Sequence, residues 1–322
     1  MPETFADVGH CVDAVLRRVG SRVVLALPLG IGKPNPLVNE FYRRARRDPG
    51  LDLTILTALS LLKPVARSAV EARLLDPLVA RVFGSYVEPE YARDLRADRL
   101  PPNVRVVEFF LAPGAFLHSG HAQRNYLSAN YTHVARDTLA RGVNVIAQLL
   151  ARRVVNGQLQ LSLGSNPDVS VDLLPLVAEA RRAGRDIVVV GESHAQMPFM
   201  TGHAQVEPEQ FDFLIDDPRY DYDLFAPPHG AIGTAEHAIG MHVSSLLRDG
   251  GTLQVGIGEL GGSRSEVVSQ HVLALLRLLG HRLYPVLEVV ASVLGLSELG
   301  CKLRNLGNPA AQLLLGDREL VG

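Results

Sequence analysis

The sequence predicts an α/β fold, with an open, mainly parallel sheet that has helices on both faces, plus the start of a second α/β domain. Apolar runs that suit strands alternate with amphipathic helical segments, as in layered α/β proteins. The clearest unit is a strand at 22–28, a glycine- and proline-rich turn, a helix at 37–47 and a strand at 51–57. Two strands joined through a helix imply parallel pairing, with a right-handed connection.

The remaining segments continue this alternation. A short helix is predicted at 9–20, and residues 60–100 predict a helical insertion of two or three helices, which would supply a packing or dimer surface. Such a surface would allow the chain to form a homo-oligomer. Further strands are predicted at 104–111, 143–149, 158–163 and 185–190, helices at 134–141 and 173–183, and a polar loop at 114–133.

Composition and charge limit the function. The chain has 322 residues, enough for two domains with sizeable cores, and its net charge of -2 gives no electrostatic case for nucleic acid or an anionic membrane. Cys11 and Cys301 form no metal or redox motif. No uncharged apolar run reaches the roughly 18 residues that span a bilayer. A soluble, cytoplasmic protein with no membrane partner is expected.

The domain boundary is predicted near Ala226. The segment 196–230 has several prolines, many aspartates and little periodicity, which is typical of a linker. Residues 1–225 then form the first domain, and 226–322 form a partial second α/β domain with a divergent helical C-terminus.

The second domain opens with the segment on which the functional interpretation depends. In 239–262, Ile239 and Val243 lie on one face of a predicted helix, and the Asp-Gly-Gly at 249–251 ends it. A strand at 252–255 leads into Gly256 and Gly258. Glycines at the carboxyl end of a strand let backbone N–H groups approach an anion or a carbonyl oxygen.

A second glycine loop follows the first strand, in Gly30-Ile31-Gly32-Lys33-Pro34. It lies between a strand and a helix, where backbone N–H groups and the helix dipole favour anions. It matches neither the P-loop nor the dinucleotide fingerprint, and a plain βα turn is the alternative. Two polar segments are further candidates: 125–133 as a binding loop, and 162–168, where Asp168 more simply caps a turn.

The string D-G-G-T-L-Q-V-G-I-G at 249–258, supported by Q-M-P at 196–198, resembles the acetyl-CoA hydrolase/transferase family, relatives of 4-hydroxybutyrate and succinate:acetate CoA-transferases. The resemblance covers roughly residues 20 to 262. It implies a CoA-transferase-like fold, an acyl-CoA substrate, a carboxylate or water as acceptor, and no metal or redox cofactor. It also implies substrate or CoA contacts, at Gly30, Gly32, Pro34, Asn130, Gly256 and Gly258.

In that family a glutamate in an S-E-M-x-x-D-G motif attacks the thioester and forms a glutamyl-CoA thioester, a form of covalent catalysis. The nearest string here is Gly-Leu-Ser-Glu-Leu-Gly at 295–300, which makes Glu298 the candidate nucleophile; a surface position is the alternative. Glu259 is a second candidate. Because the motif is incomplete, the chain is expected to be truncated or divergent after about residue 262, and a non-catalytic CoA-binding or scaffold protein is the rival interpretation.

A serine hydrolase is the other rival. Gly191-Glu192-Ser193-His194-Ala195 nearly matches the G-x-S-x-G nucleophile elbow, and Asp216 and His229 or His237 follow in the right order. Against it, Met197-Pro198 is a poor start for the helix that an elbow needs. The histidines form no H-E-x-x-H motif or other zinc spacing, so no metal is expected.

Overall fold

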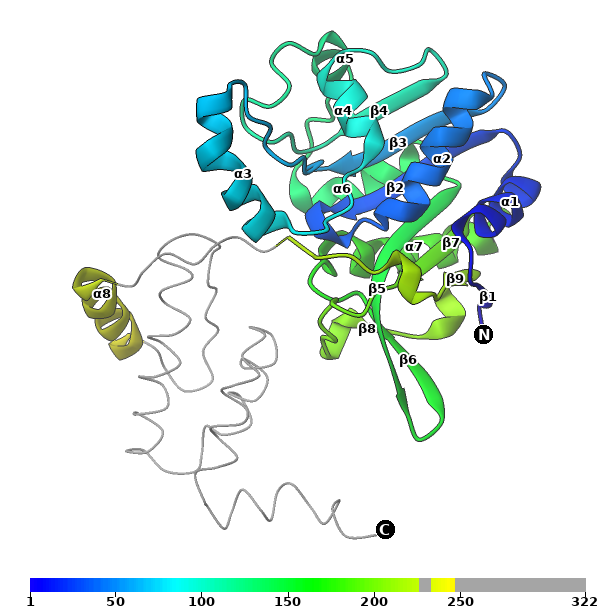
Figure 1. Cartoon of the computed structure of the whole chain (residues 1–322). Helices are drawn as coiled ribbons and strands as arrows, with labels where there is room; N and C mark the ends of the chain where they lie inside the picture. Colours follow the sequence, from blue (N-terminus) through cyan, green and yellow to red (C-terminus); the bar gives the residue numbers. More distant parts are fainter. Residues whose placement is uncertain (226–232, 247–322) are drawn as a thin grey trace, which may run out of the picture. The chain divides into compact units, whose positions relative to one another are not determined.

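The computed structural model describes residues 1–225 and 233–246. The predicted fold class is confirmed: within these residues an α/β unit is built on an open, mainly parallel sheet of order β1-β9-β7-β5-β2-β3-β4, shown in Figure 1. The antiparallel strands β6 and β8 extend it beside β5. The strands are β1 Glu3–Phe5, β2 Arg22–Leu29, β3 Asp52–Ala58, β4 Val104–Glu108, β5 Val145–Val155, β6 Gln158–Ser162, β7 Val188–Ser193, β8 Gln205–Val206 and β9 Phe213–Ile215.

Both faces of the sheet are covered, because its strands are apolar on both sides. On β2, Val23 and Leu25 pack with helices α1 and α2, whereas Val24 and Ala26 pack in a separate core cluster with α6 and α7. The helices are α1 Val8–Val19, α2 Asn35–Arg47, α3 Ala69–Phe83, α4 Glu90–Arg96, α5 Gly120–Arg124, α6 Val134–Ala140 and α7 Asp168–Arg182.

The chain reverses its direction across the sheet between β2 and β5. From β2 it moves outward to β3 and then β4, and it returns through α5 and α6 to place β5 on the other side of β2. The connection after β2 therefore runs toward one edge of the sheet, and the connection after β5 runs toward the other edge. In open α/β sheets, a crevice outside the carboxyl ends of two such strands is the usual ligand site.

Three features differ from the sequence prediction. The segment after residue 196 was expected to be a linker, but Phe213–Ile215 forms β9 between β7 and β1. Three apolar residues among prolines and aspartates give too short a pattern to detect, and long-range pairing makes the strand. Helix α7 begins at Asp168 instead of residue 173, and α5 together with the 3-10 turn Tyr131–His133 interrupts the predicted polar loop.

Residues Met1–Ala226 form one compact unit and Pro227–Gly322 another. In the second unit the structure describes α8, Thr234–Ser245, which starts five residues before the predicted helix. Its identity as an α/β domain stays a prediction, because the strand at 252–255 and the loop at 256–258 lie outside the described residues. Among the residues described in both units, no helix is long and apolar enough to cross a bilayer.

Candidate functional site

The loop that follows β2 lies at the carboxyl edge of the sheet, at the reversal between β2 and β5. Gly30–Gly32 forms a 3-10 turn, and Gly30 has φ of 60°, a left-handed conformation that glycine adopts without strain. Helix α2 begins directly beyond this turn, with Pro34 as its N-cap residue. The loop therefore joins a parallel strand to a helix N-terminus, as predicted.

Lys33 is buried beneath this loop, with only 1% of its surface exposed. Its Nζ donates hydrogen bonds to the carbonyl oxygens of Gly30 at 3.2 Å, Ala58 at 2.5 Å and Leu59 at 3.1 Å. Leu59 has φ of 49°, a conformation that costs a side-chain-bearing residue free energy. Lys33 thus ties the glycine loop to the end of β3 and holds the strained residue there.

Two carboxyl groups face Lys33. Burial lowers the pKa of Lys33 to about 7, and the negative charges of Glu108 and Asp168 oppose this decrease. Glu108 is the last residue of β4 and is 2% exposed. Burial raises the pKa of Glu108, while the Ser60 hydroxyl, which donates to its Oε1, and Lys33 act against the increase. Within the described part of the chain, the Oε2 of Glu108 has no hydrogen-bond partner.

The segment 162–168 also lies beside the glycine loop. A Cβ added to Gly32 would lie 2.7 Å from the Cβ of Asn166, so these two residues touch closely. Asn166 is buried, and its Oδ1 has no hydrogen-bond partner among the described residues. Asp168 is the first residue of α7, whose N-cap residue is Pro167. Burial raises the pKa of Asp168, and nearby backbone N–H groups and Lys33 oppose the increase.

Replacing Gly32 with Ala therefore tests whether this contact is required. The new methyl group displaces Asn166, and the expected loss in unfolding free energy is about 2 kcal/mol, typical of overpacking. The double variant Gly32→Ala/Asn166→Gly removes the clashing Cβ and should recover more than half of that loss, as measured by urea denaturation. If the losses of unfolding free energy in Gly32→Ala and Asn166→Gly simply add in the double variant, the contact is not tight.

A second buried carboxyl group lies at the end of β7. Glu192 is completely buried, and its Oε2 accepts a 3.3 Å hydrogen bond from the N–H of Leu37 in the first turn of α2. No residue of 1–225 or 233–246 forms a hydrogen bond with its Oε1. Burial raises the pKa of Glu192 to about 8, and the negative charge of Asp221 adds to this increase. Glu192 is therefore mostly protonated at neutral pH.

The predicted site residues fall into three sets. Gly30, Gly32 and Pro34 lie together at the carboxyl edge. Asn130 is exposed, and its side chain accepts hydrogen bonds from the N–H and hydroxyl of Thr132, which makes it a local cap at the end of a loop. Gly256, Gly258, Glu259 and Glu298 lie outside the described residues.

Ser193 does not occupy a nucleophile elbow. It is the last residue of β7, is 8% exposed, and has no positive φ; no helix follows it directly. Its hydroxyl donates a 2.6 Å hydrogen bond to Asp216, whose other oxygen pairs with Arg152. The acceptor is a carboxylate that already pairs with an arginine. The predicted nucleophile elbow at Ser193 is therefore wrong, while the side chains of His229 and His237, the predicted histidine partners, lie outside those that the structure describes.

Sequence reasoning missed Lys33, Glu108 and Glu192 as a group. A signal was present, since each glutamate lies at or next to the end of a mostly apolar strand: Val-Arg-Val-Val-Glu in β4 and Val-Val-Val-Gly-Glu-Ser in β7. A carboxyl group at the carboxyl end of a buried parallel strand is placed at the ligand-binding edge.

Comparison with known proteins supports the architecture. No family model matches the chain, and no curated protein matches its sequence. RipA from Yersinia pestis shares its fold, with a TM-score of 0.55 and 16% identity over 83% of this chain and 54% of RipA. A 4-hydroxybutyrate CoA-transferase from Porphyromonas gingivalis covers 83% of this chain and 50% of its own length, with a TM-score of 0.45 and 17% identity.

A putative alpha subunit of citrate lyase from Streptococcus mutans also matches, with a TM-score of 0.46 and 13% identity over 85% of this chain and 50% of its own. The chain spans about half the length of these solved proteins. At such identities the likeness to RipA establishes a shared α/β fold, without an activity.

Proposed function

We propose that this chain acts as an acyl-CoA transferase or acetyl-CoA hydrolase on short-chain acyl-CoA. The observation that carries the proposal is the meeting of the glycine loop at 30–32 with the segment at 165–168, where the chain reverses across the sheet. The family resemblance of the string at 249–258 and the fold shared with RipA support it.

In the proposed reaction, a glutamate carboxylate attacks the thioester carbonyl carbon. The C–S bond breaks, CoA leaves as the thiolate and an acyl-glutamyl anhydride forms. The thiolate then attacks the glutamyl carbonyl, releases the acyl group as a carboxylate, and leaves a glutamyl-CoA thioester. Glu298 is the candidate nucleophile. Backbone N–H groups of the glycine loops stabilise the oxyanion, and no metal or redox cofactor takes part.

Glu108 and Glu192 are poor candidates for the nucleophile. Both are buried, and burial raises the pKa of each, which favours the protonated form over the attacking carboxylate. Their proposed role is to shape the edge that binds the acyl group. An acyl-CoA-binding protein without turnover is the second candidate function, favoured by the incomplete glutamate motif.

The deciding experiment measures acetyl-CoA hydrolysis and CoA exchange, followed by intact mass after borohydride treatment. An enzyme gives turnover and a reduced adduct on one glutamate, which peptide mapping locates. Saturable CoA binding without turnover supports the binding protein. If acetyl-CoA neither binds nor reacts, the proposed function is wrong.

Ser193→Ala provides an internal control for the chemistry. We expect acyl-CoA turnover to stay within about twofold of the unmodified protein, because the Ser193 hydroxyl bonds to Asp216 and the backbone at Ser193 lacks the turn of a nucleophile elbow. The lost hydrogen bond should lower the unfolding free energy by about 1 kcal/mol. Complete loss of turnover with intact folding would restore the serine hydrolase.

A further inference from the structure

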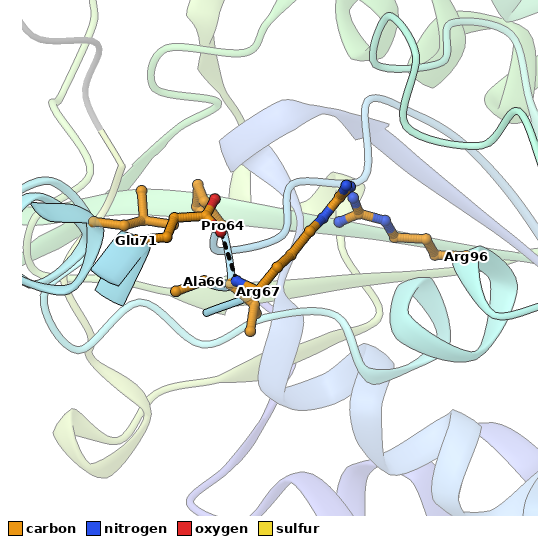
Figure 2. Close-up of a pocket in the computed structure, with 7 residues that line it drawn as sticks. Pro64, Ala66, Arg67, Glu71 and Arg96 are labelled. Atoms are coloured by element: carbon orange, nitrogen blue, oxygen red, sulfur yellow. Dashed lines mark hydrogen bonds between the residues drawn. The ribbon is translucent and has the colours of Figure 1, made fainter. Parts of the chain in front are cut away.

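A surface pocket lies apart from the glycine loop, beside the helical insertion. It has a volume of about 740 Å³ and is formed by residues 64–67, the first turns of α3 and the end of α4 (Figure 2). Volumes of this order are typical of sites for small organic ligands. Arg67 and Arg96 both line it, and in Figure 2 their side chains extend toward one another.

Neither guanidinium group has a carboxylate or hydrogen-bond partner within the described parts of the chain. By contrast, Arg93 in the same helix as Arg96 pairs with Glu88, and Arg43 pairs with Glu90. Two unpaired guanidinium groups directed at one pocket repel each other, and a bound anion would remove this repulsion. Arginine also suits phosphate, because its planar group of donors can bind two oxygens at once.

The one carboxylate in the pocket wall is already engaged. Glu71 accepts a 2.7 Å hydrogen bond from the backbone N–H of Arg67, and its own N–H donates to the Ser68 hydroxyl at 3.2 Å. This reciprocal pair is a capping box that starts α3. These backbone contacts at the start of α3 hold the Glu71 carboxylate, so it does not serve as counter-ion to the guanidinium groups.

The rest of the wall is apolar. Val65, which is 75% exposed, and Leu75 offer aliphatic surface beside the two arginines. A ligand that matches this wall carries phosphate together with a flat, weakly polar group such as a purine. Inorganic phosphate alone would leave most of the volume empty.

The pocket also lies close to the candidate site along the chain. Lys33 donates a hydrogen bond to the carbonyl oxygen of Leu59, and Pro64 in the pocket wall lies five residues after Leu59 in the chain. Five residues span at most about 18 Å, a distance comparable to the extended arm that joins the nucleotide of CoA to its thiol.

We propose that the pocket between Arg67 and Arg96 binds the phosphorylated adenosine end of CoA, with the two guanidinium groups on its phosphates. The proposal rests on the proposed function for its ligand. The two arginines can bind a phosphate whether or not the protein turns over acyl-CoA. Binding of the isolated nucleotide therefore tests the pocket assignment separately from the enzyme.

The test is calorimetric titration with adenosine 3′,5′-bisphosphate, the nucleotide fragment of CoA. Arg67→Ala and Arg96→Ala should each weaken binding about tenfold, as expected for a lost hydrogen-bonded ion pair. Arg73→Ala is the matched control, since it removes the same charge from α3 but does not line the pocket. Unfolding midpoints of all three variants establish that they fold.

Kinetics separate the two proposals if the protein turns over acetyl-CoA. The arginine variants should raise KM for acetyl-CoA and leave KM for acetyl-pantetheine, which lacks the nucleotide, unchanged. Turnover of acetyl-CoA with unchanged KM in both variants would overturn the pocket assignment while the enzyme stands. Bisphosphate binding that depends on both arginines, in a protein without turnover, would retain the pocket and reject the enzyme.

Three other outcomes overturn the pocket assignment. One is the absence of bisphosphate binding, and another is equal binding by Arg67→Ala, Arg96→Ala and Arg73→Ala. The third is tighter binding of ATP than of the bisphosphate, which would assign the pocket to a different nucleotide.

Discussion

Replacing Lys33 with Met is expected to lower the unfolding free energy by about 3 kcal/mol. The ammonium group bonds to three carbonyl oxygens from the glycine loop and the end of β3, and each buried carbonyl left without a donor costs about 1 kcal/mol. The Glu108 carboxyl group also loses its nearest positive charge. Urea denaturation followed by circular dichroism measures the change.

Lys63→Met is the matched control for this prediction. The Nζ of Lys63 donates to a single carbonyl, that of Gly84, at a more exposed position, so a loss of about 0.5 kcal/mol is expected. Adding Glu108→Gln to Lys33→Met should recover part of the stability, because the double variant no longer buries an unpaired carboxyl group. Equal unfolding midpoints for Lys33→Met and Lys63→Met would show that Lys33 does not hold the loop.

The second large effect is a dependence of stability on pH that comes from Glu192. Burial raises the folded-state pKa of Glu192 to about 8, above the 4.5 of an exposed glutamate. Between these values the folded protein keeps a proton that the unfolded chain releases. The unfolding free energy therefore falls as the pH rises from about 4.5 to 8, by about 5 kcal/mol for a pKa difference of about 3.5.

Glu192→Gln removes this titration and keeps an acceptor for the N–H of Leu37. Near pH 5 the variant and the unmodified protein should have similar stability, and at pH 9 the variant should be more stable by about 5 kcal/mol. Glu179→Gln on the exposed side of α7 is the matched control. A difference between Glu192→Gln and the unmodified protein that stays constant from pH 5 to 9 would contradict the prediction.

Much of the fold was predictable because its pattern is local. The strand predicted at 22–28 is β2, the helix at 37–47 is α2 and the strand at 51–57 is β3, each within about two residues. Their continuous apolar character also predicted burial on both faces of a parallel sheet. The edge strand β1 and its neighbour β9 escaped prediction, because each has only three residues. Their pairing also joins segments more than 190 residues apart in the chain, with Glu3 opposite Phe213.

The candidate site was predictable only in part. The glycine loop at 30–32 was found from its position between a strand and a helix, whereas Lys33 within the same string gave no sign of its burial. The serine at 193 matched a motif but lacks the required backbone turn. A motif specifies residue types and spacing, and the chemistry depends on the backbone conformation and partners that accompany them.

By itself the sequence determined the alternation of strands and helices, and the glycine loop at the carboxyl end of β2. These follow from backbone propensities and apolar periodicity, which act over a few residues. Only the tertiary structure decided that Gly32 touches Asn166, that Lys33 is buried beside Glu108, and that Arg67 and Arg96 line one pocket. Burial and charge pairing depend on which distant segments pack together, and this is a property of the folded chain as a whole.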